Sequence, residues 1–201
     1  MKRALLLLLA FALPIATVSG HGGSHKAPSP KVETLPGPEP SAAHRYFGDI
    51  PLVDQHGRTH RLYSDLIAGR IVVIDFMYTE CGDACPMMSG TFEKIQKRLG
   101  DRVGKDVLLL SFSVDPKDTP AKLKEYAARF HAGPGWYFLT GDKANVEAAL
   151  RKLGGQVESR EGHTNLFILG NEPTGLWKKA FGLADPAGVM KVVDSVVNDR
   201  G

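Results

Sequence analysis

Residues 71–86 of the chain read IVVIDFMYTECGDACP. The first six, Ile71–Phe76, form a continuous run of the kind that is buried on both faces of a sheet. Both cysteines of the chain, Cys81 and Cys85, follow in the next segment, and Pro86 is predicted to occupy the first position of a helix. The order predicts a buried strand, a loop that carries two thiols, and a helix that starts at the second thiol.

Apolar spacing on the carboxyl side predicts the remaining elements. Met88, Phe92, Ile95 and Leu99 fall on one helical stripe. Further strands are predicted at 107–114 and 137–139, with a hairpin of 166–169 and 176–181, and further helices after Thr119-Pro120, Asp142 and Asp185-Pro186, the middle one ended by Gly154-Gly155. The order β-α-β-α-β-α-β-β-α predicts an α/β sandwich whose last two strands form an antiparallel edge.

Composition narrows the class of protein. The chain has 25 Lys+Arg against 22 Asp+Glu, a net charge of +3, without a long basic run, so nucleic acid is not an expected partner. A hydrophobic content of 43% is enough to bury a core. Two cysteines are too few for a disulfide-stapled miniprotein, a four-thiolate zinc site or an iron–sulfur cluster.

The N-terminal region is predicted to lie outside the folded domain. A basic start and the apolar run 4–18 make residues 1–20 a signal peptide or a short membrane anchor, and no lipobox cysteine follows. Residues 21–45 are rich in Pro, Gly and His and are expected to be a flexible linker, which leaves 46–201 as the domain. A new α-amine and His21 could chelate a metal after cleavage, although solvated linker histidines are the simpler interpretation.

The cysteine pair is the main chemical signal. Cys85 is predicted to lie at a helix N-terminus, where the unpaired N–H groups and the helix dipole are expected to favour its thiolate form. Two thiols at this spacing can close to a disulfide or hold one metal ion, and a purely structural disulfide is disfavoured because so short a loop removes little unfolded-state entropy.

The donor set favours copper, which tolerates two or three soft ligands. His163 stands directly before the predicted strand at 166–169 and is the candidate third donor, against the alternative of a histidine with no ligand role. His56 and His60 flank Gly57 in a predicted turn and are expected at the surface. Met87 lies off the apolar stripe and near the thiols in the sequence. Three interpretations are open for it: a soft metal donor, part of a docking surface, or an ordinary exposed or half-buried methionine.

Two motifs carry a family resemblance: residues 76–86 read FMYTECGDACP, and residues 111–120 read SFSVDPKDTP. Together they resemble motifs of the Sco/SenC family, thioredoxin-fold copper proteins of cytochrome c oxidase assembly, and the resemblance covers about 51–197. It implies an α/β, thioredoxin-like three-layer sandwich with a mixed central sheet, an extra β-α insertion and an N-terminal hairpin. It also implies copper ligation by Cys81, Cys85 and His163. In that fold the strand at 71–76 and the strand at 166–169 would be antiparallel neighbours, so that His163 would face the loop with the two cysteines. The chain departs from the family pattern at Gly162, usually Asp, and Gly82, often Pro, so the imidazole would lack a carboxylate that orients it.

The function implied is that of an exported metallochaperone rather than a turnover enzyme. It would deliver copper to the dinuclear copper site of cytochrome c oxidase or to another cuproprotein, with a redox-switchable cysteine pair. Other periplasmic copper or thiol-redox proteins are further expected partners, and the expected location is the bacterial periplasm, soluble or tethered to the inner membrane. The alternatives are a thiol–disulfide oxidoreductase that reduces cysteines of a copper-site partner, a thioredoxin-family peroxidase, for which the motif lacks an arginine, and a copper or redox sensor.

Overall fold

A computed structural model describes residues 41–156 and 165–201 of the chain. Its centre is a seven-stranded mixed sheet in the order β2-β1-β5-β4-β3-β6-β7. The strands are β1 (Pro51–Asp54), β2 (Thr59–Arg61), β3 (Ile71–Met77), β4 (Val107–Ser113), β5 (Trp136–Thr140), β6 (Leu166–Asn171) and β7 (Leu176–Phe181). Every residue of β3 and β4 is buried, as expected for central strands covered on both faces.

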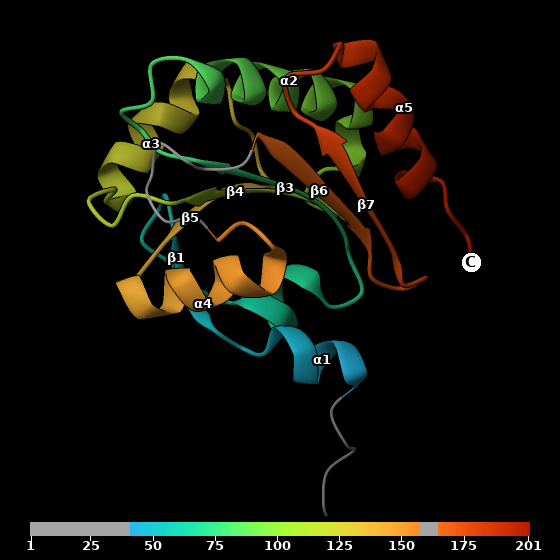
Figure 1. The fold of residues 1–201 in the computed structure, drawn as a ribbon, viewed down its shortest axis with the longest axis horizontal. Helices are drawn as coiled ribbons and strands as arrows, with labels where there is room; N and C mark the ends of the chain where they lie inside the picture. Colours follow the sequence, from blue (N-terminus) through green and yellow to red (C-terminus); the bar gives the residue numbers. More distant parts are fainter. Residues whose placement is uncertain (1–40, 157–164) are drawn as a thin grey trace, which may run out of the picture. The chain divides into compact units, whose positions relative to one another are not determined.

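Helices cover both faces of this sheet. They are α1 (Ala42–Phe47), α2 (Ala84–Leu99), α3 (Pro120–Arg129), α4 (Lys143–Leu153) and α5 (Pro186–Val197), with a π-helical turn, η1 (Leu62–Ile67), and a 3₁₀ turn, η2 (Gly100–Arg102). Figure 1 shows α2, α3 and α5 on one face and α1 and α4 on the other. The described residues therefore form the expected three layers.

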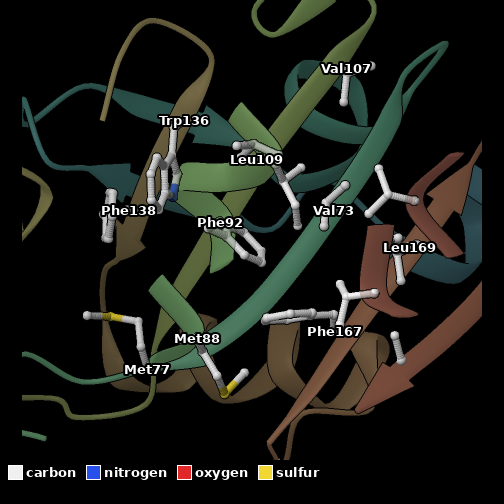
Figure 2. Close-up of a cluster of buried hydrophobic side chains, with 14 of the residues drawn as sticks. Val73, Met77, Met88, Phe92, Val107, Leu109, Trp136, Phe138, Phe167 and Leu169 are labelled. Carbon is white, nitrogen blue, oxygen red and sulfur yellow. The ribbon is translucent and has the colours of Figure 1, made fainter. Parts of the chain in front are cut away.

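Alternating side chains of the central strands divide the interior into two cores. Val73 and Met77 of β3 point to the side of α2, α3 and α5, together with Met88 and Phe92 of α2. Figure 2 shows Phe92 close to Trp136 and Phe167, and the ring centroids are 5.7 and 5.0 Å away, respectively. Residues of the opposite parity pack against α1, η1 and α4.

The strand pairing brings two segments that are distant in sequence to the same end of the central strands. β3 is parallel to β4 and antiparallel to β6, in a register that pairs Ile71 with Asn171 and Ile74 with Ile168. The carboxyl end of β3 therefore lies beside the start of β6. This confirms the predicted antiparallel neighbourhood, and β6 and β7 form the predicted antiparallel edge.

The predicted order of elements is confirmed. β1 and β2 form the N-terminal hairpin, and β5 with α4 supplies the extra β-α unit. Thr119 caps α3 through its side chain, and Gly154 ends α4 with a positive φ of 73°. Asp142 occupies the N-cap of α4, but its side chain makes no capping hydrogen bond.

Pro86 does not hold the first helical position, and that prediction was wrong. α2 begins at Ala84, so Pro86 is its third residue. The whole first turn of a helix lacks intrahelical partners for its N–H groups, and proline is tolerated there beyond the first position.

No helix among residues 41–156 and 165–201 combines the length and apolar character needed to cross a membrane.

Candidate metal centre

The two thiols lie at the junction of β3 and α2. Cys81 is half-buried in the loop after β3, whereas Cys85 is fully buried in the first turn of α2 and packs into the core with Met88. Neither cysteine is in a disulfide. The N–H of Cys85 donates to the Sγ of Cys81 over 3.4 Å, so an amide in the first turn of α2 faces the more accessible sulfur.

This geometry is contrary to the role expected for Cys85. Burial raises the pKa of the Cys85 thiol well above its usual range, and Cys81 and Asp75 act in the same direction. The expectation that the helix N-terminus favours a Cys85 thiolate was therefore wrong, because desolvation outweighs the helix field at this sulfur. The amide that was expected to serve Cys85 serves Cys81.

Asp118 fixes the loop that carries Cys81. Its buried carboxylate accepts hydrogen bonds from the N–H of Thr79 (2.9 Å) and from the Thr79 hydroxyl. It also accepts from the Ser113 hydroxyl at the end of β4 (2.7 Å), and its backbone carbonyl accepts from the Thr140 hydroxyl (3.0 Å). The loop after β3 and the loop after β4 are thus joined two residues before Cys81. In the sequence, Asp118 was noted only within the second motif.

Asp75 is a second residue whose importance the sequence analysis missed. It lies in the middle of β3, on the same face as Val73 and Met77, and is fully buried. Neither carboxyl oxygen has a hydrogen-bond partner among the described residues, and burial raises the pKa of Asp75 to about 7 against the opposing effect of the nearby Ser111 hydroxyl. A carboxylate inside an otherwise apolar strand was the signal that could have revealed it.

Two further hydroxyls accompany the thiols on this side of the sheet. The Ser89 and Tyr126 hydroxyls are 3.2 Å apart and buried. Burial raises the pKa of Tyr126, and the charges of Cys85 and Asp75 add to that effect. Burial and repulsion between Asp75, Tyr126 and the Cys85 thiol therefore disfavour negative charge in this part of the core.

The third predicted ligand, His163, lies outside the described residues, as do Gly162 and His21. Within the part of the chain that is described, no three His, Cys, Asp or Glu side chains gather into a group that could hold a metal ion. The described residues thus bring together two soft donors, Cys81 and Cys85.

The other described histidines have local roles. His44 stacks on Tyr63 with ring centroids 4.8 Å apart, and His131 pairs with Glu93 at 3.2 Å. His56 is exposed as expected, but His60 is largely covered, because its Nε2 lies 2.9 Å from the buried Asp54 carboxylate. The surface prediction was therefore correct for only one of the two.

Met87 is 64% exposed, on the first turns of α2 close in sequence to Cys85. Its neighbour Met88 is fully buried, as the helical stripe predicted. The side chain of Met87 is thus available at the surface near the thiols.

Comparison with known proteins identifies the family. A family model described as SCO1/SenC matches residues 38–197. This chain belongs to the SCO1/SenC family. Its relatives include the SCO1 protein homolog of Bacillus subtilis, which is 32% identical over 150 residues that cover 72% of each chain. The SCO2-like protein of Rickettsia felis is 35% identical over 107 residues, 53% of this Sco-family chain and 50% of the relative, so the match spans half the relative's length.

Solved Sco structures share the fold. BsSco, described as a member of the Sco family of cytochrome c oxidase assembly proteins with a disulfide switch, superposes with a TM-score of 0.61 at 29% identity, covering 77% of this chain and 94% of that one. ScoI of Bradyrhizobium japonicum with copper bound gives 0.58 at 27% identity, covering 73% and 96%. The thioredoxin-like fold expected for this Sco-family chain is thereby confirmed.

Proposed function

We propose that this chain is an exported copper chaperone that holds copper with Cys81, Cys85 and His163. The observation that carries the proposal is the meeting of the cysteine loop, at the end of β3, with the start of β6. His163 precedes Asn165 by two residues, which span at most about 7 Å of extended chain. The antiparallel register therefore supports an imidazole within reach of the two sulfurs.

The donor set supports copper over other metals. Thiolate sulfur and imidazole nitrogen are soft and borderline ligands that suit Cu(I) and also bind Cu(II), whereas a closed zinc site takes about four protein ligands. The copper-bound structure of ScoI from Bradyrhizobium japonicum shows that a relative of this fold takes the metal. Copper would be cargo here, held until a partner removes it.

The cysteine pair would couple binding to redox state. Oxidation of the two thiols forms one S–S bond and releases two protons and two electrons to a thiol oxidant, and it removes two of the three ligands. The disulfide switch described for BsSco supports this coupling in the family. A recipient such as the dinuclear copper site of cytochrome c oxidase is supported by the description of BsSco as an oxidase assembly protein.

Residues 1–20 fit this role as an export signal or anchor and the Pro-, Gly- and His-rich segment after them as a linker, while the copper-binding domain extends from 46–201 back to α1, which begins at Ala42. A short apolar run behind a basic start directs a chain out of the cytoplasm. We therefore place the protein in the periplasm, either free or tethered to the inner membrane through its N-terminus.

One observation favours a second function, thiol–disulfide exchange. Cys81 is half-buried and accepts an amide hydrogen bond, while Cys85 is fully buried behind it. An accessible attacking thiol with a buried resolving thiol is the arrangement that reductases use. Such a reductase would act on cysteines of a copper-site partner and would not need His163.

A copper titration of the reduced protein separates the two functions. We expect one copper ion per chain and a thiolate-to-copper(II) charge-transfer absorption, both lost in Cys81→Ser and Cys85→Ser. His163→Ala should weaken copper binding by about tenfold or more, as removal of a metal ligand or its support does. His131→Ala is the matched control, because that side chain is 79% exposed and pairs only with Glu93 among the described residues. Unchanged copper binding in His163→Ala, together with intact disulfide reduction, would favour the reductase.

A further inference from the structure

A cavity of about 480 Å³ opens on the sheet face opposite Cys85. It is an open hollow bordered by α1, the end of α4 and the strands β6 and β7. Phe47, Leu153, Ile168 and Trp177 make its apolar lining. A volume of this size lies in the range of small-molecule sites. The copper proposal makes no use of it.

Gly170 lies beneath the Trp177 ring that lines the cavity. β6 and β7 pair Gly170 with Trp177, and a Cβ at Gly170 would lie 2.4 Å from the indole ring. Because glycine has no side chain, the indole can lie directly over β6. Phe47 approaches from α1, with its ring centroid 5.3 Å from that of Trp177. The two rings give the cavity an aromatic wall.

Three cations surround this apolar lining. Arg151, Lys152 and Lys179 are exposed, and none makes an ion pair with another described residue. Lys152 lies over the Tyr46 ring, with Nζ 5.0 Å from its centroid, and the Tyr46 hydroxyl donates to the Lys152 carbonyl. No aspartate or glutamate of the described ranges lines the cavity.

The arrangement of the three cations in space carries the argument, because other exposed lysines of the described ranges, such as Lys124, also lack an ion pair. The presence of Arg151 and Lys152 in the last turn of α4 has a second explanation, because a helix C-terminus favours cations. That explanation does not extend to Lys179, which belongs to β7 and whose Nζ lies 3.8 Å from the position of a Cβ on Gly154. Cations from two elements therefore converge on one hollow.

We propose that this cavity binds an amphipathic organic anion, with its apolar body against Phe47 and Trp177 and its carboxylate or phosphate between Lys179 and Arg151. Charge complementarity supplies the argument for the anion, and the aromatic wall supplies the argument for the apolar body. Cations that make no ion pair with another described residue can make charge-assisted hydrogen bonds to such a group. The ligand is a free single-chain acid or the matching part of an anionic lipid, and both present this chemistry.

The indole of Trp177 gives a direct readout. The other tryptophan, Trp136, is buried in the opposite core, so a ligand in the cavity changes the fluorescence of Trp177 alone. We expect decanoate to cause a saturable change, decanol to bind about tenfold more weakly, and decyltrimethylammonium to cause none. Trp177→Phe should abolish the fluorescence change while calorimetry still detects decanoate binding. Equal responses to decanoate and decanol would overturn the proposal.

Charge variants test the assigned cations. Lys179→Gln and Arg151→Gln should each weaken decanoate binding several-fold, whereas Lys124→Gln, an exposed lysine on α3, should leave it unchanged. Copper stoichiometry does not depend on the cavity, so an unchanged value in each variant would show that the fold is intact. Equal losses in Lys124→Gln and Lys179→Gln would indicate a general charge effect and overturn the assignment.

Vesicles distinguish the two sources of ligand. Binding to phosphatidylglycerol vesicles that decanoate competes away, and that Lys179→Gln weakens, identifies a lipid, whereas decanoate binding without vesicle binding identifies a free acid. Either result supports the amphipathic-anion site. If decanoate does not compete with vesicle binding and Lys179→Gln does not change it, the membrane contact lies elsewhere on the protein. If decanoate also fails to bind, the proposed amphipathic-anion site is overturned.

Discussion

Thr79 donates its N–H and its hydroxyl to the two oxygens of Asp118, and this pair joins the loop before Cys81 to the loop after β4. Both residues come from the motifs that carried the family resemblance. Two strands that are neighbours in the sheet thus hold their following loops together by one buried carboxylate. The position of the accessible thiol depends on that carboxylate.

Replacement of Asp118 by Asn should loosen the cysteine loop. The Asn side chain has the same size as Asp but carries an NH₂ group in place of one carboxylate oxygen. That NH₂ group would face the Thr79 or the Ser113 hydroxyl, which also donates, so one buried donor loses its partner. The expected cost is about 1–3 kcal/mol in unfolding free energy. We expect faster alkylation of Cys81 in the folded, metal-free protein, as well as a lower urea midpoint. Asp194→Asn is the control, since its pair with Arg98 is exposed and worth little. Identical alkylation rates in the two variants would contradict a positioning role.

The two thiols should differ in reactivity. Cys85 is fully buried with a raised pKa, whereas Cys81 is half-buried and faces an amide. In the reduced protein we expect Cys81 to be alkylated by iodoacetamide at least about tenfold faster than Cys85. Mass spectrometry of Cys81→Ser and Cys85→Ser variants measures each rate separately, and urea should bring the two rates together. Faster modification of Cys85 in the folded protein would show that the assigned asymmetry is wrong.

Asp75 should make stability depend on pH. The unfolded carboxyl titrates near 3.8 and the folded one at about 7, so below pH 3.8 both states hold the proton and no penalty exists. As pH rises from about 4 to 7 the unfolded state loses its proton first, and folding loses roughly 4 kcal/mol at most. Asp75→Asn should remove this loss, so its unfolding free energy, relative to the parent, rises across that range. Parallel urea-derived stability curves for the two metal-free proteins between pH 4 and 7 would contradict the buried-carboxyl account.

Gly170 should not tolerate a side chain. A Cβ would lie 2.4 Å from the Trp177 ring, so Gly170→Ala must displace the indole and is expected to cost about 1–3 kcal/mol in unfolding free energy. Gly188→Ala is matched to it, because that glycine lies in α5 with nothing within 4 Å of an added Cβ, and alanine favours a helix by up to about 1 kcal/mol. Urea unfolding of both variants should therefore give shifts of opposite sign. A stabilised Gly170→Ala would mean that the indole moves freely.

Most of the architecture could be predicted because it rests on local patterns. The run at 71–76, the stripe through Met88 and Phe92, and the glycine after Leu153 are each sufficient to indicate an element or its end. The β3–β6 pairing followed from the resemblance to a known fold, and the observed register confirms it. The exact start of α2 was not predictable from Pro86, because proline is compatible with several positions of a first turn.

The electrostatics of the site could not be predicted in the same way. Whether Cys85 is a thiolate depends on the competition between the helix N-terminus and desolvation, and desolvation is set by residues distant in sequence, such as Tyr126 and Phe167. The partners of Asp118 come from three separate segments. A sequence pattern can name such residues, but only the packed structure determines which charge state each prefers.

The pairing of β3 with β6 also sets an order of events. Ile71 and Asn171 are partners although the chain between them contains α2, α3, α4 and two further strands. Loops of that length close late, because their closure entropy is offset only when the intervening elements have packed. If the proposed ligand before β6 completes the site, a newly exported chain has two thiols long before it has a full set of donors. Tight copper capture would then act as a check on maturation, restricted to molecules whose last strands are already in place.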